Sequence, residues 1–280
     1  MALSGPVIAA VLVGALLHAL WNALVKSSDD KAMDTALIHL LGSMVAIPLV
    51  LWLGWPRADA WPFIAVSLLV HVGYYTTLAG AYRHGDLGLT YPLMRGTAPL
   101  LVALSATFTL GETLSPLAWA GVLGISAGVL ALGLSPQARM APQAIRFALV
   151  NAVIIAIYTV IDALGVRASG HALQYVATLF LLDGWPFALI VFASRRATVL
   201  AYARRRWPLA LLGAIASMGS YGVALWAMTQ APVATVAALR ETSVLFAVVL
   251  GVWFLKERLN TRRVVGACAI AAGVMALRMG

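Results

Sequence analysis

The chain is built from long, uninterrupted runs of hydrophobic residues separated by short polar connections. Each run is long enough to cross a bilayer as an α-helix, which needs about 20 apolar residues. The runs are continuous and do not alternate, so they lack the pattern of a membrane β-barrel. The pattern predicts an all-α polytopic membrane protein with ten transmembrane helices. The ten runs are 4–25, 34–54, 61–82, 88–110, 115–134, 144–166, 171–194, 207–229, 233–255 and 261–277.

The composition excludes the soluble classes of protein. Of the 280 residues, 62% are hydrophobic and 10% are charged, whereas a soluble domain carries about 25% charged residues. Ten spans would use nearly the whole chain and leave no room for a nucleotide-binding domain, so an ATP-driven pump is not expected. The single cysteine, Cys268, excludes an internal disulfide and a cysteine-based metal site. We expect neither a metal nor a cofactor.

The basic residues are distributed unevenly between the two sets of connections. Fourteen Lys and Arg residues fall in the odd-to-even connections, and three fall on the opposite side. Basic loops stay in the cytoplasm, so we expect both termini outside the cytoplasm. The net charge of +9 then reflects contact with anionic lipid headgroups, and nucleic acid is not an expected partner.

The chain also repeats itself. Trp61-Pro62 and Trp207-Pro208 each open a run, and between Arg95 and Leu132 we count 13 identities in 38 positions at an offset of 145. The repeat predicts two five-helix halves, 1–137 and 138–280. Because five is odd, equivalent helices run in opposite directions, which is typical of secondary transporters that bind substrate between the halves. The matched pairs include Arg95 with Arg240, Thr97 with Thr242, Glu112 with Glu257, Gly121 with Gly266, and Gly128 with Gly273.

Three strings carry a family resemblance: HALWNALVK at 18–26, GETL at 111–114 and KERL at 256–259. With ten runs in two halves, the whole chain resembles the EamA-type transporters of the drug/metabolite transporter superfamily. Within it, the chain is similar to the bacterial exporters of amino acids, the aromatic amino-acid exporters included. The resemblance implies a basket of ten helices around a central cavity in the bacterial inner membrane. The small multidrug exporters of that superfamily use a glutamate in their first helix, which the first run here lacks.

Polar side chains inside a bilayer are costly and therefore mark candidate sites. Trp21 and Asn22 share one helical face with His18 and Lys26 in the first run, where they offer a flat apolar wall and a two-way hydrogen-bonding group. His71 and Tyr75 share a face in the third run. Each face either lines a cavity or packs against neighbouring helices.

Two arginines are the strongest candidates for binding an anion. Arg95 lies between Pro92 and Pro99, and its repeat partner Arg240 precedes Glu241. A permanently charged guanidinium in a membrane needs an anion. That anion is either a substrate carboxylate or a protein acid, for which the choices are Glu241, Asp162 and Asp183.

Further candidates lie in the second half. Asn151, Tyr158 and Asp162 form one stripe of the sixth run, and Asp162 is a candidate proton site, an amine partner or an ion-pair partner of an arginine. Tyr221 lies between two glycines. The sequence Asp183-Gly184-Trp185-Pro186 predicts a helix break. We expect Glu112 and Glu257 to have structural roles at helix ends, and the paired glycines to allow close helix contact within one chain or between two.

These observations predict a secondary transporter that exports small metabolites, foremost amino acids with aromatic or apolar side chains, by alternating access. The alternatives are export of lipophilic cations or drugs, or of a sugar or nucleotide-type metabolite. Coupling remains open between facilitated diffusion, exchange and proton antiport, and the oligomeric state is open, a monomer included. Scattered histidines and the lack of an HExxH string argue against an enzyme. The candidate substrate-binding residues are Trp21, Asn22, His71, Tyr75, Arg95, Tyr158, Asp162, Tyr221 and Arg240.

Overall fold

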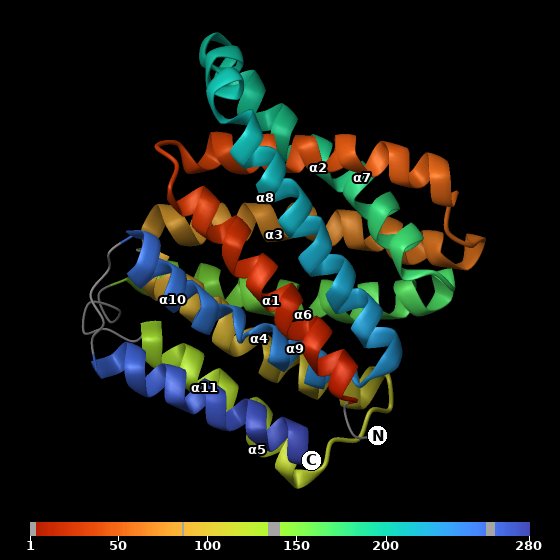
Figure 1. The fold of residues 1–280 in the computed structure, drawn as a ribbon, viewed down its shortest axis with the longest axis vertical. Coiled ribbons are helices and arrows are strands. Elements are labelled where there is room, and N and C mark those ends of the chain that lie inside the picture. Colours follow the sequence, from red (N-terminus) through yellow and green to blue (C-terminus); the bar gives the residue numbers. More distant parts are fainter. Residues whose placement is uncertain (1–3, 86, 134–140, 256–260) are drawn as a thin grey trace.

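The computed structural model describes residues 4–85, 87–133, 141–255 and 261–280. Within these ranges the regular structure is helical throughout, as the hydrophobic runs predict (Figure 1). The elements are α1 (Gly5–Lys26), α2 (Lys31–Leu53), the short 3-10 helix η1 (Ala58–Ala60), α3 (Trp61–His84), α4 (Leu87–Thr109), α5 (Pro116–Gly133), α6 (Pro142–Ser169), α7 (Ala172–Ser194), α8 (Arg196–Gln230), α9 (Val233–Arg240), α10 (Ser243–Leu255) and α11 (Thr261–Met279).

Local chemistry explains where several helices begin and end. The Asp30 carboxylate accepts a hydrogen bond from the backbone amide of Met33 at 3.1 Å, which caps the start of α2. Helix α2 ends at Gly54, with φ at 80°, and α6 ends at Gly170, with φ at 74°. A positive φ is strained for residues with a side chain, so glycine terminates both helices without cost.

Among the described residues, seven segments are both long and apolar enough to cross a membrane, whereas ten runs were marked in the whole sequence. Helices α5 and α11 are apolar but contribute shorter segments, and α4 carries Thr90, Tyr91 and Arg95. The chain is an all-α protein with the apolar helices of an integral membrane protein. The seven comprise α1, α2, η1 with α3, α6, α7, α8, and 233–250 across α9 and α10.

The ninth run does not form the single continuous helix expected for 233–255. Helix α9 ends at Arg240, and Glu241 and Thr242 form a turn before α10. The backbone amides of these two residues donate to the carbonyls of Ala238 and Leu239, each at 3.0 Å. These bonds span three residues where an α-helix spans four. The turn aims the Glu241 side chain across the bundle.

The helix break predicted at Asp183 is wrong, because α7 continues through Gly184 and Pro186 to Ser194. Gly184 lies against α2, where an added Cβ would collide with the Ser43 hydroxyl and the His39 carbonyl. The Ser43 hydroxyl also donates to the Phe180 carbonyl at 2.8 Å. Close packing against α2 therefore holds this stretch helical, and the Asp183 side chain is not a helix cap.

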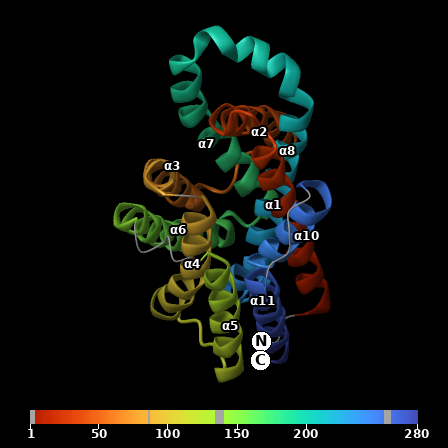
Figure 2. The same ribbon diagram turned by 90° about the vertical axis from the view of Figure 1, so that its left-hand side faces the viewer.

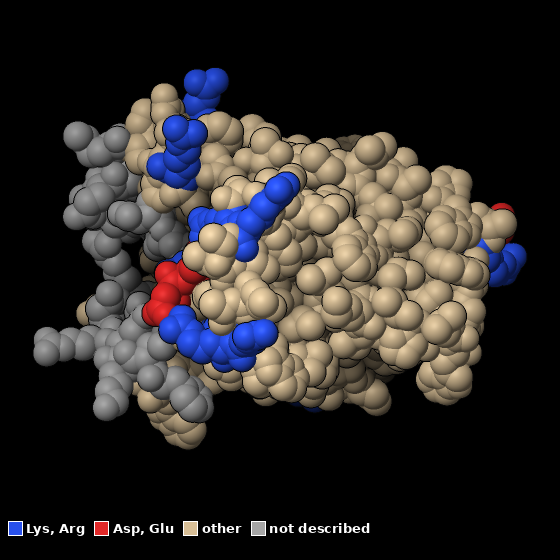
Figure 3. Space-filling view, turned by 90° about the horizontal axis from the view of Figure 1, so that it is seen from above, with Lys and Arg blue, Asp and Glu red and all other residues tan. Residues whose placement is uncertain are grey.

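The helices cross one another in an arrangement in which both termini lie at the same end (Figure 1). Helix α1 packs on α8, α2 on α7, α3 on α6 and α5 on α11, while α4 contacts α5, α6 and α9. Figure 2 shows α8 extending past the bundle to join α7 in an arc above α2. On the face drawn in Figure 3, most of the visible Lys and Arg side chains lie toward the left-hand side, and one further basic group lies at the right-hand edge.

Glycines bring α5 and α11 into backbone contact. A Cβ added at Gly121 would lie 2.8 Å from the Gly273 carbonyl oxygen, and one added at Gly128 would lie 2.8 Å from the Gly266 carbonyl oxygen. The contact is reciprocal, since the same distances apply to the carbonyls facing Gly266 and Gly273. Of the two possibilities left by the sequence, these glycines serve close packing within one chain.

Candidate functional site

A row of aromatic rings crosses the interior between α3, α6 and α7. His71 stacks on Tyr158 with ring centroids 4.6 Å apart and an interplanar angle of 28°. Tyr74 meets Tyr158 edge-on at 5.8 Å and Tyr75 at 5.3 Å. Tyr75 in turn stacks on Phe187 at 5.3 Å. We call these five residues the aromatic row. It offers a continuous apolar wall with hydroxyl and imidazole groups along it.

Asp162 lies at one end of the aromatic row and is fully buried. One carboxylate oxygen accepts a hydrogen bond from the Tyr175 hydroxyl at 2.8 Å, and the other accepts one from the Tyr221 hydroxyl. Ser67 is also in hydrogen-bonding reach, and His71 is a further electrostatic neighbour. No described arginine forms an ion pair with Asp162. The groups that donate hydrogen bonds to its carboxyl are hydroxyls.

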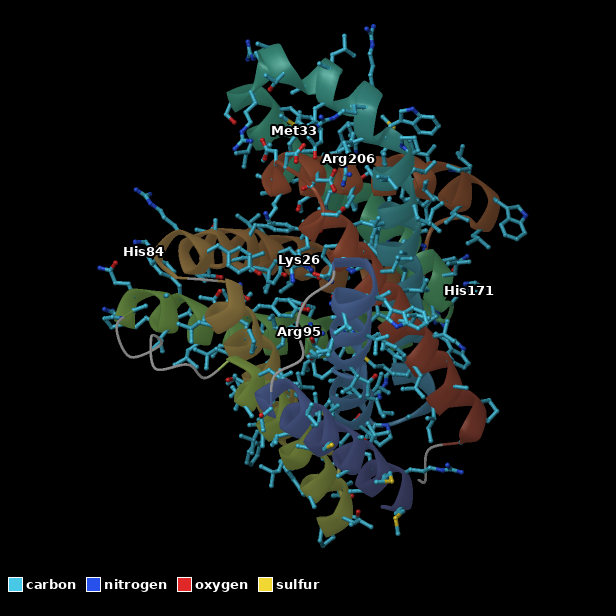
Figure 4. All side chains as sticks on the ribbon, turned by 60° about the vertical axis from the view of Figure 1, so that its left-hand side comes forward. Lys26, Met33, His84, Arg95, His171 and Arg206 are labelled. Carbon is cyan, nitrogen blue, oxygen red and sulfur yellow. The ribbon has the colours of Figure 1, made fainter. Side chains whose placement is uncertain are left out.

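Arg95 and Glu241 form a buried ion pair between the two halves of the sequence. Nε of Arg95 donates to Oε2 of Glu241 at 2.9 Å, and Nη2 lies 2.9 Å from Oε1. Nη2 makes this close contact outside good hydrogen-bond geometry. Both residues are buried, with exposed fractions of 8% and 3%. Figure 4 shows Arg95 in the interior, between His84 at one end of the bundle and His171 at the other.

Arg240 has different neighbours. Its guanidinium carbon lies 5.4 Å from the centre of the Tyr221 ring, in a cation–π contact. The side chain is half-buried, and none of the described carboxylates forms an ion pair with it. Tyr221 therefore contacts a cation through its ring and an anion, Asp162, through its hydroxyl. Arg240 keeps its donors available to a ligand.

Helix α1 supplies another part of this region. The Trp21 indole donates to Nδ1 of His18 at 3.2 Å, and the Asn22 amide donates to the His18 carbonyl at 2.7 Å. His18 lies within electrostatic range of both Arg95 and Arg240. One Asn22 amide hydrogen is therefore bonded within α1 itself. His18 is the residue of this helix face that lies near the two arginines.

A second acid, Asp183, lies beyond the aromatic row on α7. The Tyr75 hydroxyl donates to Oδ2 of Asp183 at 2.7 Å, and Nδ1 of His39 on α2 lies 3.5 Å from the same hydroxyl. The His39 ring packs edge-on against Tyr75 and Phe187, at 5.5 and 6.1 Å. This group joins three helices around one carboxylate.

Most of the nine sequence candidates come together. His71, Tyr75 and Tyr158 belong to the aromatic row, and Asp162, Tyr221 and Arg240 form a connected set beside it. Arg95 is directed to Glu241. In the described part of the chain, no side-chain hydrogen bond or ring contact joins Trp21 or Asn22 to the other seven. Both contact His18, which lies near Arg95 and Arg240. Sequence reasoning did not single out His39, Ser67 or Tyr175. Their signal was weak, although a histidine within a hydrophobic run is costly enough to mark His39.

Asn151, on the same predicted stripe, does not face the site. Its amide donates to the Tyr74 carbonyl at 2.9 Å and to the Thr77 hydroxyl at 2.8 Å, so it joins α6 to α3. Glu112 lies at helix ends, where it accepts from Arg167 at 3.1 Å and from the backbone amide of Val233 at 3.0 Å. Glu257 lies outside the described residues. Asn151 and Glu112 connect helices of the two halves.

Two further features of the described residues bear on ligand binding: possible metal-ligand groups and a surface recess. These residues contain no group of three or more His, Cys, Asp or Glu side chains placed to hold a metal ion. A recess of about 320 Å³ lies at the ends of α5, α9 and α11, remote from all nine candidates. Its lining residues are Thr113, Leu114, Ser115, Ala118, Pro232, Thr235, Leu277 and Gly280.

Comparison with known proteins supports the family resemblance for the second half of the chain. Residues 143–279, just under half of its length, match the model of the EamA-like transporter family. No curated protein matches significantly. Among solved structures 29 chains match. One, titled "Crystal structure of protein", has a TM-score of 0.70 at 19% identity, with 96% of each chain covered. That likeness establishes the fold alone, while the family match indicates a membrane transporter of the drug/metabolite type.

Proposed function

We propose that the chain is a secondary transporter that exports amino acids with aromatic or apolar side chains by alternating access. The observation that carries the proposal is Arg240, a half-buried arginine with no ion-pair partner among the described residues, beside a row of aromatic rings. A guanidinium without a counterion suits a carboxylate, and aromatic rings suit an apolar side chain. An amino acid carries both groups.

The proposed architecture is ten spans in two inverted repeats, 1–137 and 138–280. The helix packing supports this architecture, because exchanging each helix for its counterpart in the other half gives the same packed pairs. The equivalent pairs α1–α8 and α6–α3 both pack together, and α2 and α5 each pack on their own counterparts, α7 and α11. The family match over 143–279 corresponds closely to the second repeat. We place the protein in a bacterial inner membrane with its basic end in the cytoplasm and both termini outside.

In the proposed complex, Arg240 binds the substrate carboxylate and Tyr221 holds Arg240 in place. Asp162 orients Tyr221 through its hydroxyl and adds negative charge near the site. His71, Tyr75 and Tyr158 receive the apolar side chain, and Trp21 with Asn22 closes the opposite wall. Arg95, held by Glu241, contributes positive potential. Rocking of the halves about α4 and the turn after α9 would expose this site to each side in turn.

Counterflow into liposomes tests the proposal directly. Purified protein is reconstituted, the vesicles are loaded with an unlabelled amino acid, and entry of radiolabelled tryptophan, leucine or a small polar amino acid is followed. We expect saturable counterflow of the aromatic and aliphatic substrates and little of the polar one. An Arg240→Gln variant should lose it, whereas Arg278→Gln, far from the site at the C-terminus, should keep it. Counterflow of a lipophilic cation alone would instead support the drug-export alternative.

A further inference from the structure

One buried acid is left without a role by the proposed substrate site. Asp183 lies in the middle of α7, a segment long and apolar enough to span a membrane. The Tyr75 hydroxyl donates a hydrogen bond to its Oδ2 at 2.7 Å. Among the described residues no lysine or arginine forms an ion pair with Asp183. An ionised carboxylate in a membrane interior costs several kcal/mol unless it is paired, so an acid in such a position is a candidate functional group.

The groups that face Asp183 can be named helix by helix. From α2 comes His39, which interacts electrostatically with Asp183 and, more weakly, with His71. From α3 comes Tyr75, whose hydroxyl stands between the carboxylate and Nδ1 of His39. From α6 and α8, which also pack on α7, no described side chain forms a hydrogen bond or an ion pair with Asp183. One carboxylate and one imidazole therefore share a hydroxyl bridge.

The two buried aspartates differ in accessibility. Asp162 has no exposed surface, and both of its oxygens accept hydrogen bonds from tyrosines. Both acceptor oxygens of Asp162 are therefore already occupied by hydroxyl donors. Asp183 and His39 are only half-buried, and no described group donates a hydrogen bond to the second oxygen of Asp183. Proton transfer requires an acceptor within hydrogen-bonding reach that is not already saturated, a condition that Asp183 meets and Asp162 does not.

We propose that Asp183, with His39 and Tyr75, is the proton-binding site of this transporter. The proton enters on the His39 imidazole. Nδ1–H of His39 then donates its proton to the Tyr75 oxygen while the Tyr75 O–H proton passes to Oδ2 of Asp183, which leaves neutral imidazole, intact tyrosine and a neutral carboxyl. Because α2 and α3 belong to the first predicted repeat and α7 to the second, the proton changes the contact between repeats. The use of this proton in transport rests on the proposed function.

Infrared difference spectroscopy tests the site without any substrate. Spectra of the full chain in lipid vesicles are compared between acidic and neutral pH, and the carbonyl stretch of a protonated carboxyl is followed. We expect a band that Asp183→Asn removes and Asp162→Asn leaves in place. Tyr75→Phe keeps the ring on Phe187 and removes the hydroxyl bridge, so the midpoint of that band should shift. A wild type without the band, a band that persists in D183N, or an unshifted midpoint in Y75F would overturn the proposal.

Transport assays then separate this inference from the proposed substrate. In vesicles with a pH gradient, D183N should keep counterflow of the amino acid and lose its stimulation by the gradient. Gradient stimulation equal to that of the wild type would contradict the proton site. If the infrared band behaves as expected but no amino acid shows counterflow, the proposed substrate class fails and the proton site stands.

Discussion

Arg95 and Arg240 occupy equivalent positions in the two halves of the sequence, yet their surroundings differ. Arg95 lies within the continuous helix α4 and is neutralised by Glu241. Arg240 is the last residue of α9 and stacks on Tyr221. The cation therefore recurs at both matched positions, whereas the acid that follows Arg240 in the sequence pairs with Arg95.

The residue after each arginine explains the difference. Glu241 follows Arg240 and lies in a turn, whereas Gly96 follows Arg95 within α4. A Cβ added at Gly96 would lie 2.7 Å from Cγ of Leu130 on α5, so the first half has no room for an acid there. Tight helix packing leaves no space for a carboxylate directly after Arg95, and among the described residues Arg240 has no ion-pair partner.

The largest expected effect comes from removing the shared counterion. Glu241→Gln leaves Arg95 buried without an anion, and we expect the loss of about 3–5 kcal/mol of unfolding free energy. Denaturant titration in detergent micelles measures it. The double variant Arg95→Met with Glu241→Gln should recover much of that loss, because no unpaired charge remains. If E241Q is as stable as the wild type, Arg95 does not depend on Glu241 as a counterion, and the proposed difference between the two arginines is contradicted.

Removing the free arginine should affect transport more than folding. Arg240→Gln is expected to lower kcat/KM for an amino acid by about 10- to 100-fold, in line with about 1.5–3 kcal/mol for a hydrogen bond to a charged group. Unfolding free energy should change little, since no described ion pair is broken. Equal losses of stability in R240Q and E241Q would contradict the comparison.

The packing that excludes an acid from the first half can be tested at Gly96. Gly96→Ala should destabilise the fold by about 1–3 kcal/mol, because its methyl group would overlap Leu130. Gly222→Ala on α8 is the matched control, since its added Cβ would lie 3.8 Å from the nearest side-chain atom, at ordinary contact distance. If thermal unfolding shows the same midpoint for both variants, tight packing at Gly96 is not the reason for the asymmetry.

The smallest effect is expected at the ring that supports the free arginine. Tyr221→Phe keeps the cation–π contact and removes one of the two tyrosine donors to Asp162. We expect a loss of about 1 kcal/mol in unfolding free energy and a modest fall in transport. Tyr175→Phe removes the other donor without touching Arg240, so it should match the stability loss and spare transport. A complete loss of transport in Y175F would place Asp162 itself in contact with substrate.

Much of the fold could be read from local pattern, and much of the site could not. The run marked at 61–82 became a helix over Trp61–His84, and the run at 171–194 became Ala172–Ser194, because apolar length alone decides where a helix forms. The break at Glu241 and the continuity through Asp183 were missed. In each case the residues contact a distant helix that the local sequence does not reveal. Glu241 pairs with Arg95 on α4, and the stretch around Asp183 packs against α2.

By itself, the sequence determined that this is an all-helical membrane protein, that basic residues gather at one end, and that two arginines recur at equivalent positions. These properties follow from composition and spacing along the chain. Only the tertiary structure decided that Glu241 pairs with Arg95, that Tyr221 joins Arg240 to Asp162, and that His39 and Tyr75 reach Asp183. These partners lie on different helices, and a side chain's charge state depends on which neighbours the packed helices bring within hydrogen-bonding distance.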